Sequence, residues 1–317
     1  MPSSVKKTPL VLSRLYGPVH SRRLGYSLGV DILPYKTCTF NCVYCQLGRT
    51  PNKSLKRAKF FTVREVLPQV KIALRRGQPM DYITFSGSGE PTLNTEIGKI
   101  IREIKKCTSV PVAVLTNSSL LSRKSVRQAL LAADLVVPSL DAATARTFRK
   151  VNRPAPSINL EDIITGLVKF RSEFKGQIWL EVMLVKGVND SPAEIKALRK
   201  AIARINPDKV QLNTVVRPPA EKWARPLSPR ELDDVKKKLG GQAEVTADTE
   251  GQPPSPAPED SAQAILSYIR RRPASLKDLA ETLGQNKKTI CRSLNALVTK
   301  GVIKKVLHRR IYYYELK

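Results

Sequence analysis

Three cysteines lie within eight residues of one another. Cys38, Cys42 and Cys45 have the spacing C-x3-C-x2-C in the segment KTCTFNCVYCQLGRT. This layout is poor for disulfides and suits a metal in a reducing compartment. Four cysteines close a [4Fe-4S] cluster coordinatively, whereas three leave one iron open to another ligand. A structural zinc site needs a fourth ligand such as histidine, and His20 and His308 are both remote from the motif. The spacing therefore favours a cluster with an open iron over zinc.

A second segment, FSGSGEPT at residues 85–92, is rich in glycine. Gly87 and Gly89 would let the backbone approach a ligand more closely than side chains permit, and Ser88 and Glu90 add polar groups beside them. A G-x-G-E sequence on its own is usually a turn. Here it follows a predicted strand, one strand-helix unit after the cysteines, and this position favours a ligand-binding loop.

Alternating β-rich and amphipathic helical segments predict the frame that positions both loops. The alternation predicts right-handed crossovers around one sheet, and we expect an α/β fold, a partial TIM barrel of (β/α)6 type. Functional residues in such a fold follow the carboxyl ends of the strands. The predicted strands are 27–33, 82–85, 112–116, 135–138, 177–185 and 209–214, with a further edge strand at 243–247. The predicted helices are 62–76, 95–107, 122–132, 142–150, 160–174, 192–205 and 229–239.

Further polar residues stand in the strands or follow their ends. Asn117 follows the third strand, and Ser139 and Asp141 follow the fourth. These three either contact a ligand or cap the N-termini of the next helices. Glu181 lies inside the fifth strand, where a charge is costly unless it is paired or used. Further candidates for facing a substrate are Lys186, Asn213, Arg217 and Arg153, with a solvated position as the alternative for Lys186 and Arg217. Arg22 and Arg23 either help to hold an anionic substrate or cap the barrel.

The cysteine segment, with the aromatic Tyr44 directly before Cys45, resembles the cluster motif of the radical S-adenosylmethionine (radical SAM) superfamily. The resemblance covers about residues 25–214, and the predicted partial barrel is that superfamily's fold. It implies that the three cysteines bind three irons of a [4Fe-4S] cluster, while S-adenosyl-L-methionine chelates the fourth. An electron then breaks the sulfonium bond, and the resulting 5′-deoxyadenosyl radical abstracts hydrogen from the substrate. By the same resemblance, the expected cofactor-binding residues are Tyr44, Gly87, Ser88, Gly89, Glu90, Asn117, Ser139 and Asp141.

Within the superfamily, the segment GYSLGVDILPYKTCTFNCVYCQLGRT looks most like the iron-sulfur oxidoreductase group that includes the wyosine-synthesis enzyme of tRNA. That enzyme uses a second iron-sulfur cluster on additional cysteines. This chain has no second triad, because Cys107 and Cys291 stand alone. We therefore expect a single cluster and a reaction other than wyosine formation, with a flavodoxin or ferredoxin as the reductant.

The C-terminal part differs in composition and pattern from the rest of the chain. Residues 248–260 include GQPPSPAPED, whose four prolines predict an extended linker. We expect the radical SAM partial barrel over 1–247 and a small α+β domain over 261–317. Three helical patterns and a hairpin in the second domain resemble a winged helix-turn-helix domain. By that resemblance, the third helix presents Lys287, Lys288 and Arg292 to a nucleic acid. Protein interaction is the alternative role.

The whole chain is strongly basic. Its 317 residues include 55 Lys and Arg against 27 Asp and Glu, a net charge of +28, and such a field attracts polyanions. No apolar run is long enough for a membrane helix, and we expect a cytoplasmic protein without a membrane partner. These features predict a radical SAM enzyme that acts on a macromolecule such as RNA. Two alternatives stay open: a radical SAM enzyme for a protein, peptide or small molecule, and a non-catalytic iron-sulfur redox sensor that binds DNA as a regulator.

Overall fold

The computed structural model of the chain describes residues 14–21, 23–246 and 261–317. Its main element is a sheet with the strand order β1-β2-β3-β4-β5-β6-β7-β8, in which β1 is antiparallel to β2 and the later neighbours are parallel. The predicted linker at 248–260 and the candidate Arg22 lie outside the described residues. The strands are β1 (Leu15–Ser21), β2 (Gly25–Val30), β3 (Tyr82–Phe85), β4 (Val112–Thr116), β5 (Leu135–Pro138), β6 (Gln177–Leu184), β7 (Lys209–Thr214) and β8 (Ala243–Val245).

β1 is a strand that the sequence pattern does not predict. Gly17 and Pro18 interrupt its apolar alternation, and its pairing with β2 shifts register between Tyr16 and Val19. A short antiparallel strand at the sheet edge also needs no crossover helix, so the strand-helix alternation gives no sign of it. The six predicted parallel strands and the predicted edge strand are all present, although β2 ends at Val30 rather than at residue 33.

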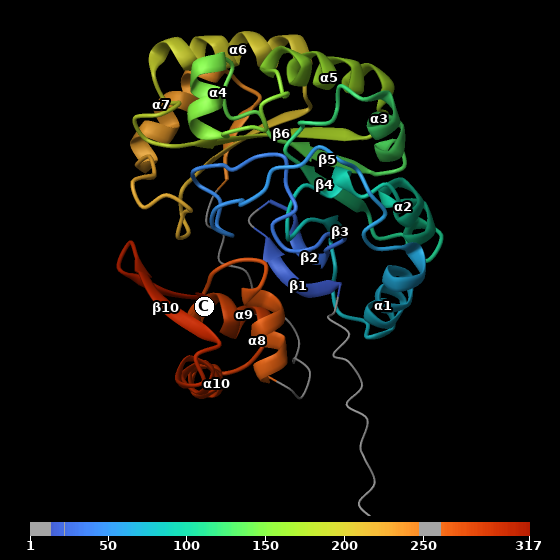
Figure 1. Cartoon of the computed structure of the whole chain (residues 1–317), viewed down its shortest axis with the longest axis vertical. Helices are drawn as coiled ribbons and strands as arrows, with labels where there is room; N and C mark the ends of the chain where they lie inside the picture. Colours follow the sequence, from blue (N-terminus) through green and yellow to red (C-terminus); the bar gives the residue numbers. More distant parts are fainter. Residues whose placement is uncertain (1–13, 22, 247–260) are drawn as a thin grey trace, which may run out of the picture.

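The helices follow the parallel strands and form an arc outside the sheet (Figure 1). Local sequence explains where several begin. α6 and α7 each start with a proline, after the N-cap residues Ser191 and Ser228, and proline is favoured at the first helical position. The helices of this part are α1 (Val63–Arg75), α2 (Ile97–Lys105), α3 (Lys124–Leu130), α4 (Ala145–Val151), α5 (Leu160–Glu173), α6 (Pro192–Ile205) and α7 (Pro229–Leu239). Each overlaps a predicted helix.

The C-terminal unit, residues 261–317, has the predicted three helices and hairpin. It contains α8 (Ser261–Ile269), β9 (Ala274–Ser275), α9 (Leu276–Leu283), α10 (Lys287–Thr299), β10 (Ile303–His308) and β11 (Ile311–Leu316), with the strand order β10-β11-β9. Its buried core includes Ile265, Leu279 and Leu294, and Val19 of β1 belongs to the same cluster. The C-terminal unit is therefore packed against the edge of the large sheet.

Candidate functional site

The cysteine loop, residues 36–50, follows β2 and is fixed by backbone hydrogen bonds to the glycine-rich segment and to the end of α4. The Glu90 amide donates to the Thr37 carbonyl at 3.0 Å, and the Val43 amide donates to the Val151 carbonyl at 2.9 Å. Phe40 and Val43 are buried in the main core and anchor the loop between its cysteines. The loop is thus held at the carboxyl ends of the strands, where the sequence predicts it.

Each of the three cysteine sulfurs lies within hydrogen-bonding distance of a nitrogen donor. The pairs are Lys36 Nζ to Cys45 Sγ at 3.3 Å, Asn117 Nδ2 to Cys38 Sγ at 3.5 Å and Asn152 Nδ2 to Cys42 Sγ at 3.4 Å. Such donors stabilise the negative charge of a thiolate that binds metal. Within the described ranges, no three His, Cys, Asp or Glu side chains form a group that could hold a metal ion. Each of the three thiols thus has its own nitrogen donor, which suits a thiolate ligand.

Burial changes the acidity of two of these thiols. It raises the pKa of Cys38 to about 12 and raises the pKa of Cys42 well above its ordinary value. Both thiols therefore hold their protons at neutral pH in the iron-free chain. Because the thiolate is the metal ligand, iron binding has to release those protons.

The glycine loop, residues 86–90, joins β3 to the short helix η1 (Pro91–Leu93) beside the cysteine loop. Gly87 has a φ of +136°, which favours glycine, and a Cβ there would lie 2.7 Å from Asp31 Cγ. A Cβ at Gly89 would lie 1.8 Å from the Thr37 carbonyl oxygen. Both glycines permit a close approach, and the neighbours that they approach in the structure are Asp31 and Thr37 of the cysteine loop.

The side chains of Ser88 and Glu90 form hydrogen bonds to other residues of the protein. Ser88 Oγ donates to Asp31 Oδ2 at 2.5 Å. Glu90 is buried, and burial raises its pKa while the hydrogen bonds it accepts oppose that rise. Its four donors are Thr92 N, Thr92 Oγ1, Thr116 Oγ1 and Asn117 N, at 3.1, 2.5, 2.7 and 2.6 Å. The Glu90 carboxylate therefore joins the start of η1 to the end of β4.

The predicted strand-end residues Asn117, Ser139 and Asp141 do not cap helices. The N-cap residues of α3 and α4 are Arg123 and Thr144, so the capping alternative is wrong for all three. Asn117 instead reaches the cysteine loop, and Ser139 Oγ lies 3.5 Å from an oxygen of Glu181 on β6.

Asp141 is the centre of a buried polar network. It accepts hydrogen bonds from the Tyr44 hydroxyl, from Asn152 Nδ2 at 2.6 Å and from the Met183 amide at 2.9 Å. Burial raises the pKa of Asp141 to about 6. Because Asn152 also donates to Cys42, the network connects Asp141 to the cysteine loop. The structure thus brings the predicted residues Tyr44 and Asp141 into direct contact.

Glu181, in β6, has partners for its charge on other segments, as a charge in a buried strand requires. Its carboxylate forms an ion pair with Arg23 and accepts a hydrogen bond from Asn213 Nδ2 at 3.2 Å. Three predicted candidates, Glu181, Asn213 and Arg23, are therefore in contact through the Glu181 carboxylate.

The other basic candidates lie apart from that group. Lys186 pairs with Glu231 at 2.7 Å, and Arg153 pairs with Glu221 at 2.6 Å. Arg217 is partly buried: burial lowers its pKa, and its Nε is enclosed without a hydrogen-bond partner in the described part of the chain. The solvated alternative does not hold for this Nε, and Tyr268, Arg272 and Asp278 of the C-terminal unit act on the charge of the side chain.

Sequence reasoning does not identify Lys36, Asn152 or Asp31, although Lys36 and Asn152 contact cysteine sulfurs and Asp31 contacts Ser88 of the glycine loop. Their one signal is proximity: Lys36 and Asp31 stand shortly before Cys38, and Asn152 precedes the candidate Arg153. Such residues are common in loops for local reasons, so proximity alone does not separate them from their neighbours.

The predicted nucleic-acid residues Lys287, Lys288 and Arg292 lie on the first turns of α10. All three are exposed, and none takes part in the ion pairs found among residues 261–317, which involve Lys277 and Lys304. Figure 1 shows α10 at the end of the molecule opposite α5 and α6. The described residues contain no helix that is long and apolar enough to cross a membrane.

Comparison with known proteins identifies relatives of both parts of the chain. GTPase Obg of Brachyspira hyodysenteriae is 37% identical over 317 residues, which cover 97% of this chain and 46% of that protein. The UPF0026 protein of Methanocaldococcus jannaschii is 38% identical, with 67% of this chain and 66% of that protein covered. The UPF0026 protein of Synechocystis sp. is 40% identical, with 64% of this chain and 76% of that protein covered. The chain thus spans about half of the first relative and just under two thirds of the second.

A family model also matches more than half of the chain. The model of the radical SAM superfamily matches residues 32–198, a range that contains the cysteine loop, the glycine loop and the Asp141 network. The chain therefore belongs to the radical SAM superfamily, whose cofactors are a [4Fe-4S] cluster and S-adenosyl-L-methionine.

Proposed function

We propose that this chain is an enzyme that reductively cleaves S-adenosyl-L-methionine at a single [4Fe-4S] cluster and modifies RNA. Cys38, Cys42 and Cys45 would hold the cluster. The observation that carries the proposal is the set of three nitrogen donors, one at each cysteine sulfur, beside a tightly packed glycine loop. A pure redox sensor would need neither an open iron nor a loop for a cleavable cofactor.

The residues of the chain have separate tasks in this proposal. A bound cluster supplies the electron that breaks the sulfonium bond. Lys36, Asn117 and Asn152 stabilise the thiolates and orient the cysteine side chains. Since the Glu90 carboxylate is fully engaged within the protein, the glycine loop would bind the methionyl group through its backbone. These contacts hold the reacting atoms in alignment, which is the main contribution that protein makes to cofactor chemistry.

The RNA substrate is inferred from the C-terminal unit, which resembles a winged helix-turn-helix domain. Residues 261–317 contain 13 basic and 3 acidic side chains, and Lys287, Lys288 and Arg292 are exposed on α10. Such a surface attracts a phosphate backbone. The match to the first relative covers 97% of this chain, so the barrel and this domain occur together there too. The similarity of the cysteine segment to the wyosine-synthesis group also favours RNA over DNA.

The first test is formation of 5′-deoxyadenosine. Anaerobically reconstituted protein with dithionite and S-adenosyl-L-methionine should produce it, and Cys42→Ala should abolish production. Cys107→Ala is the matched control, because Cys107 is exposed at the end of α2, and it should retain full production. If the wild-type protein binds a cluster but forms no 5′-deoxyadenosine, the redox-sensor alternative is supported instead.

The second test concerns RNA. Replacing Lys287, Lys288 and Arg292 together by alanine should weaken RNA binding and reduce the salt dependence of log K by about 0.7 for each phosphate that the protein no longer neutralises. The matched control replaces Lys196, Arg199 and Lys200, three exposed basic residues of α6, and should leave binding unchanged. Equal effects of both triple variants would show that α10 is not the RNA-binding element. Separately, mass analysis of RNA nucleosides from a deletion strain would identify the modified nucleoside.

A further inference from the structure

A residue of the C-terminal unit contacts the support of the glycine loop. Arg271, which follows α8, places its Nε 3.1 Å from Asp31 Oδ2, and the two side chains are only 8% and 7% exposed. Asp31 in turn accepts hydrogen bonds from the Ser88 amide at 3.2 Å and from Ser88 Oγ at 2.5 Å. One chain of contacts therefore runs from Arg271 through Asp31 to Ser88.

A second chain of contacts starts from the same arginine. The Arg271 guanidinium lies 5.0 Å from the centre of the Tyr16 ring, which is within the range of a cation–π interaction. The Tyr16 hydroxyl and Ser86 Oγ are 2.6 Å apart. Arg271 thus contacts the two residues that hold the two serines of the glycine loop.

The direction of the arginine is set by its own helix. Arg271 Nη1 donates to the Ser267 carbonyl at 2.7 Å and to Ser267 Oγ at 3.1 Å. α8 also contributes Ile265 to the core cluster that includes Val19 of β1. The position of the arginine therefore depends on how the C-terminal unit sits against the large sheet.

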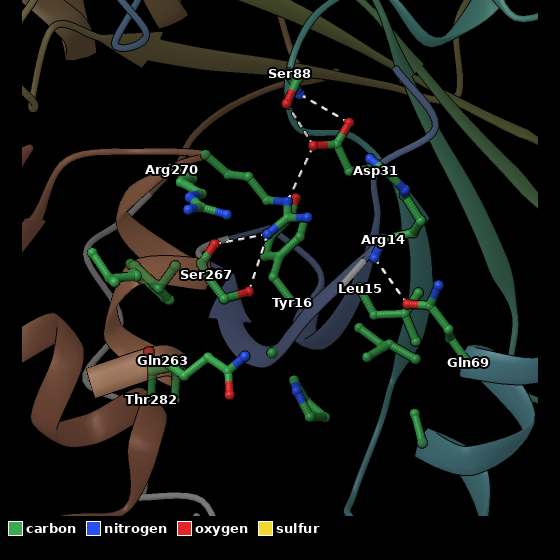
Figure 2. Close-up of a pocket in the computed structure, with 18 of the residues that line it drawn as sticks. Arg14, Leu15, Tyr16, Asp31, Gln69, Ser88, Gln263, Ser267, Arg270 and Thr282 are labelled. Carbon is green, nitrogen blue, oxygen red and sulfur yellow. Dashed lines mark hydrogen bonds and ion pairs between the residues drawn. The ribbon is translucent and has the colours of Figure 1, made fainter. Parts of the chain in front are cut away.

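A cavity borders the ion pair. A cavity of about 860 Å³ lies between α8 and the β1–α1 side of the sheet and is lined by Arg14, Asp31, Ser88 and Arg271 among others. Figure 2 shows Asp31 and Ser88 joined by hydrogen bonds at one end of this cavity. The ion pair therefore stands in the wall of this cavity and links the C-terminal unit to the support of the glycine loop.

We propose that Arg271 is a positioning residue for the cofactor: through Asp31 and Tyr16, the docked C-terminal unit fixes the backbone of residues 86–90 and thereby sets the affinity for S-adenosyl-L-methionine. The inference rests on the proposed function for its link to the cofactor. It makes the C-terminal unit part of the cofactor site as well as a surface for the substrate.

Removal of the arginine should release the loop. Asp31 would remain buried without its ion-pair partner, with only the more distant charge of Arg14 acting on it. This is unfavourable, and Asp31 would move toward water in the cavity and take Ser88 with it. Supporting residues behind a binding shell typically change affinity by about 10- to 100-fold. We expect a weakening of that size for S-adenosyl-L-methionine in Arg271→Met.

The experiment uses four variants of the full chain. Arg271→Met removes the charge, and Arg271→Lys keeps it and should recover most of the affinity. Arg270→Met is the matched control, because Arg270 lines the same cavity and is not paired with Asp31 in the structure. The double variant Asp31→Asn with Arg271→Met removes both charges and should lie closer to wild type than Arg271→Met alone.

Two measurements are made on each variant. Amide hydrogen exchange of residues 86–90 in the iron-free protein should become faster in Arg271→Met and stay unchanged in Arg270→Met. In reconstituted protein, a titration with S-adenosyl-L-methionine, followed by the electron paramagnetic resonance of the reduced cluster, gives the affinity. If Arg271→Met does not fold, Arg271→Gln, which also removes the charge, takes its place in both measurements.

The outcomes separate this inference from the proposed function. Unchanged exchange at residues 86–90 in Arg271→Met overturns the inference, and so does an unchanged affinity for S-adenosyl-L-methionine. Absence of 5′-deoxyadenosine in the wild-type reaction overturns the proposed function. In that case, the exchange measurement still decides whether Arg271 holds the glycine loop.

Discussion

Gly89→Ala should disrupt the contact between the glycine loop and the cysteine loop. An added Cβ would lie 1.8 Å from the Thr37 carbonyl oxygen, although real Cβ atoms essentially never come within 3.0 Å of a heavy atom outside their own residue and its chain neighbours. The two loops would therefore have to separate by at least 1.2 Å, the difference between these distances. The hydrogen bond from the Glu90 amide to Thr37, now 3.0 Å long, would stretch by a similar amount.

The cost can be estimated from the two effects. Overpacking costs about 1 to 3 kcal/mol, and loss of one hydrogen bond costs about 1 kcal/mol, so the free energy of unfolding should fall by about 2 to 4 kcal/mol. Urea unfolding of the iron-free protein, followed by circular dichroism, measures this change. Iron content after reconstitution should also fall, because the cysteine loop shifts.

Gly241→Ala is the matched control for this substitution. Gly241 has no other heavy atom within 4 Å of an added Cβ and no unusual φ, so the change should alter the free energy of unfolding by less than about 0.5 kcal/mol. If Gly89→Ala behaved like Gly241→Ala and kept its iron, the steric reasoning about the two loops would be refuted.

Three further predictions concern single side chains. Burial raises the pKa of Asp141 from 3.8 to about 6, so the folded state binds this proton more tightly than the unfolded state. The resulting stabilisation is complete below about pH 4 and is lost as the pH rises through 6, and its full size is roughly 3 kcal/mol. The urea midpoint of the iron-free wild type should therefore fall over this pH range, and that of Asp141→Asn should not. Asn152→Ala removes the donor to Cys42 and should make a chelator extract iron more easily, by about 10- to 100-fold in affinity, whereas equal iron retention would exclude a supporting role. Phe170→Ala removes a fully buried ring that stacks on Phe174 at 4.8 Å and should lower the unfolding free energy by about 3 to 5 kcal/mol; a loss below about 1 kcal/mol, on calorimetry, would show that the core collapses around the gap.

Much of the frame is readable from local signals. α6 and α7 start where the sequence predicts, because each has a serine at its N-cap and a proline as its first residue. The parallel strands are recognisable as short apolar runs between helices. β1 is different. Gly17 and Pro18 break its pattern, and what makes it a strand is pairing with β2 and packing against the C-terminal unit.

The candidate site divides in the same way. The cysteines and glycines are visible as motifs, whereas the donors to two of the sulfurs come from far along the chain. Asn117 is 79 residues from Cys38, and Asn152 is 110 residues from Cys42. No local pattern encodes such a pairing, because it exists only once the strand ends are brought together. The sequence leaves Arg217 open to a solvated interpretation for a related reason, since several of the groups that act on its charge belong to residues 261–317.

The position of β1 also bears on aggregation. β1 is an outer strand of the eight-stranded sheet, and outer strands with apolar side chains invite pairing with other molecules. Val19 of β1 is shielded because it belongs to the core of residues 261–317. A shortened chain that stops at residue 246 would uncover this strand, and aggregation of such a fragment would report the loss of a protective cover as well as the loss of a domain.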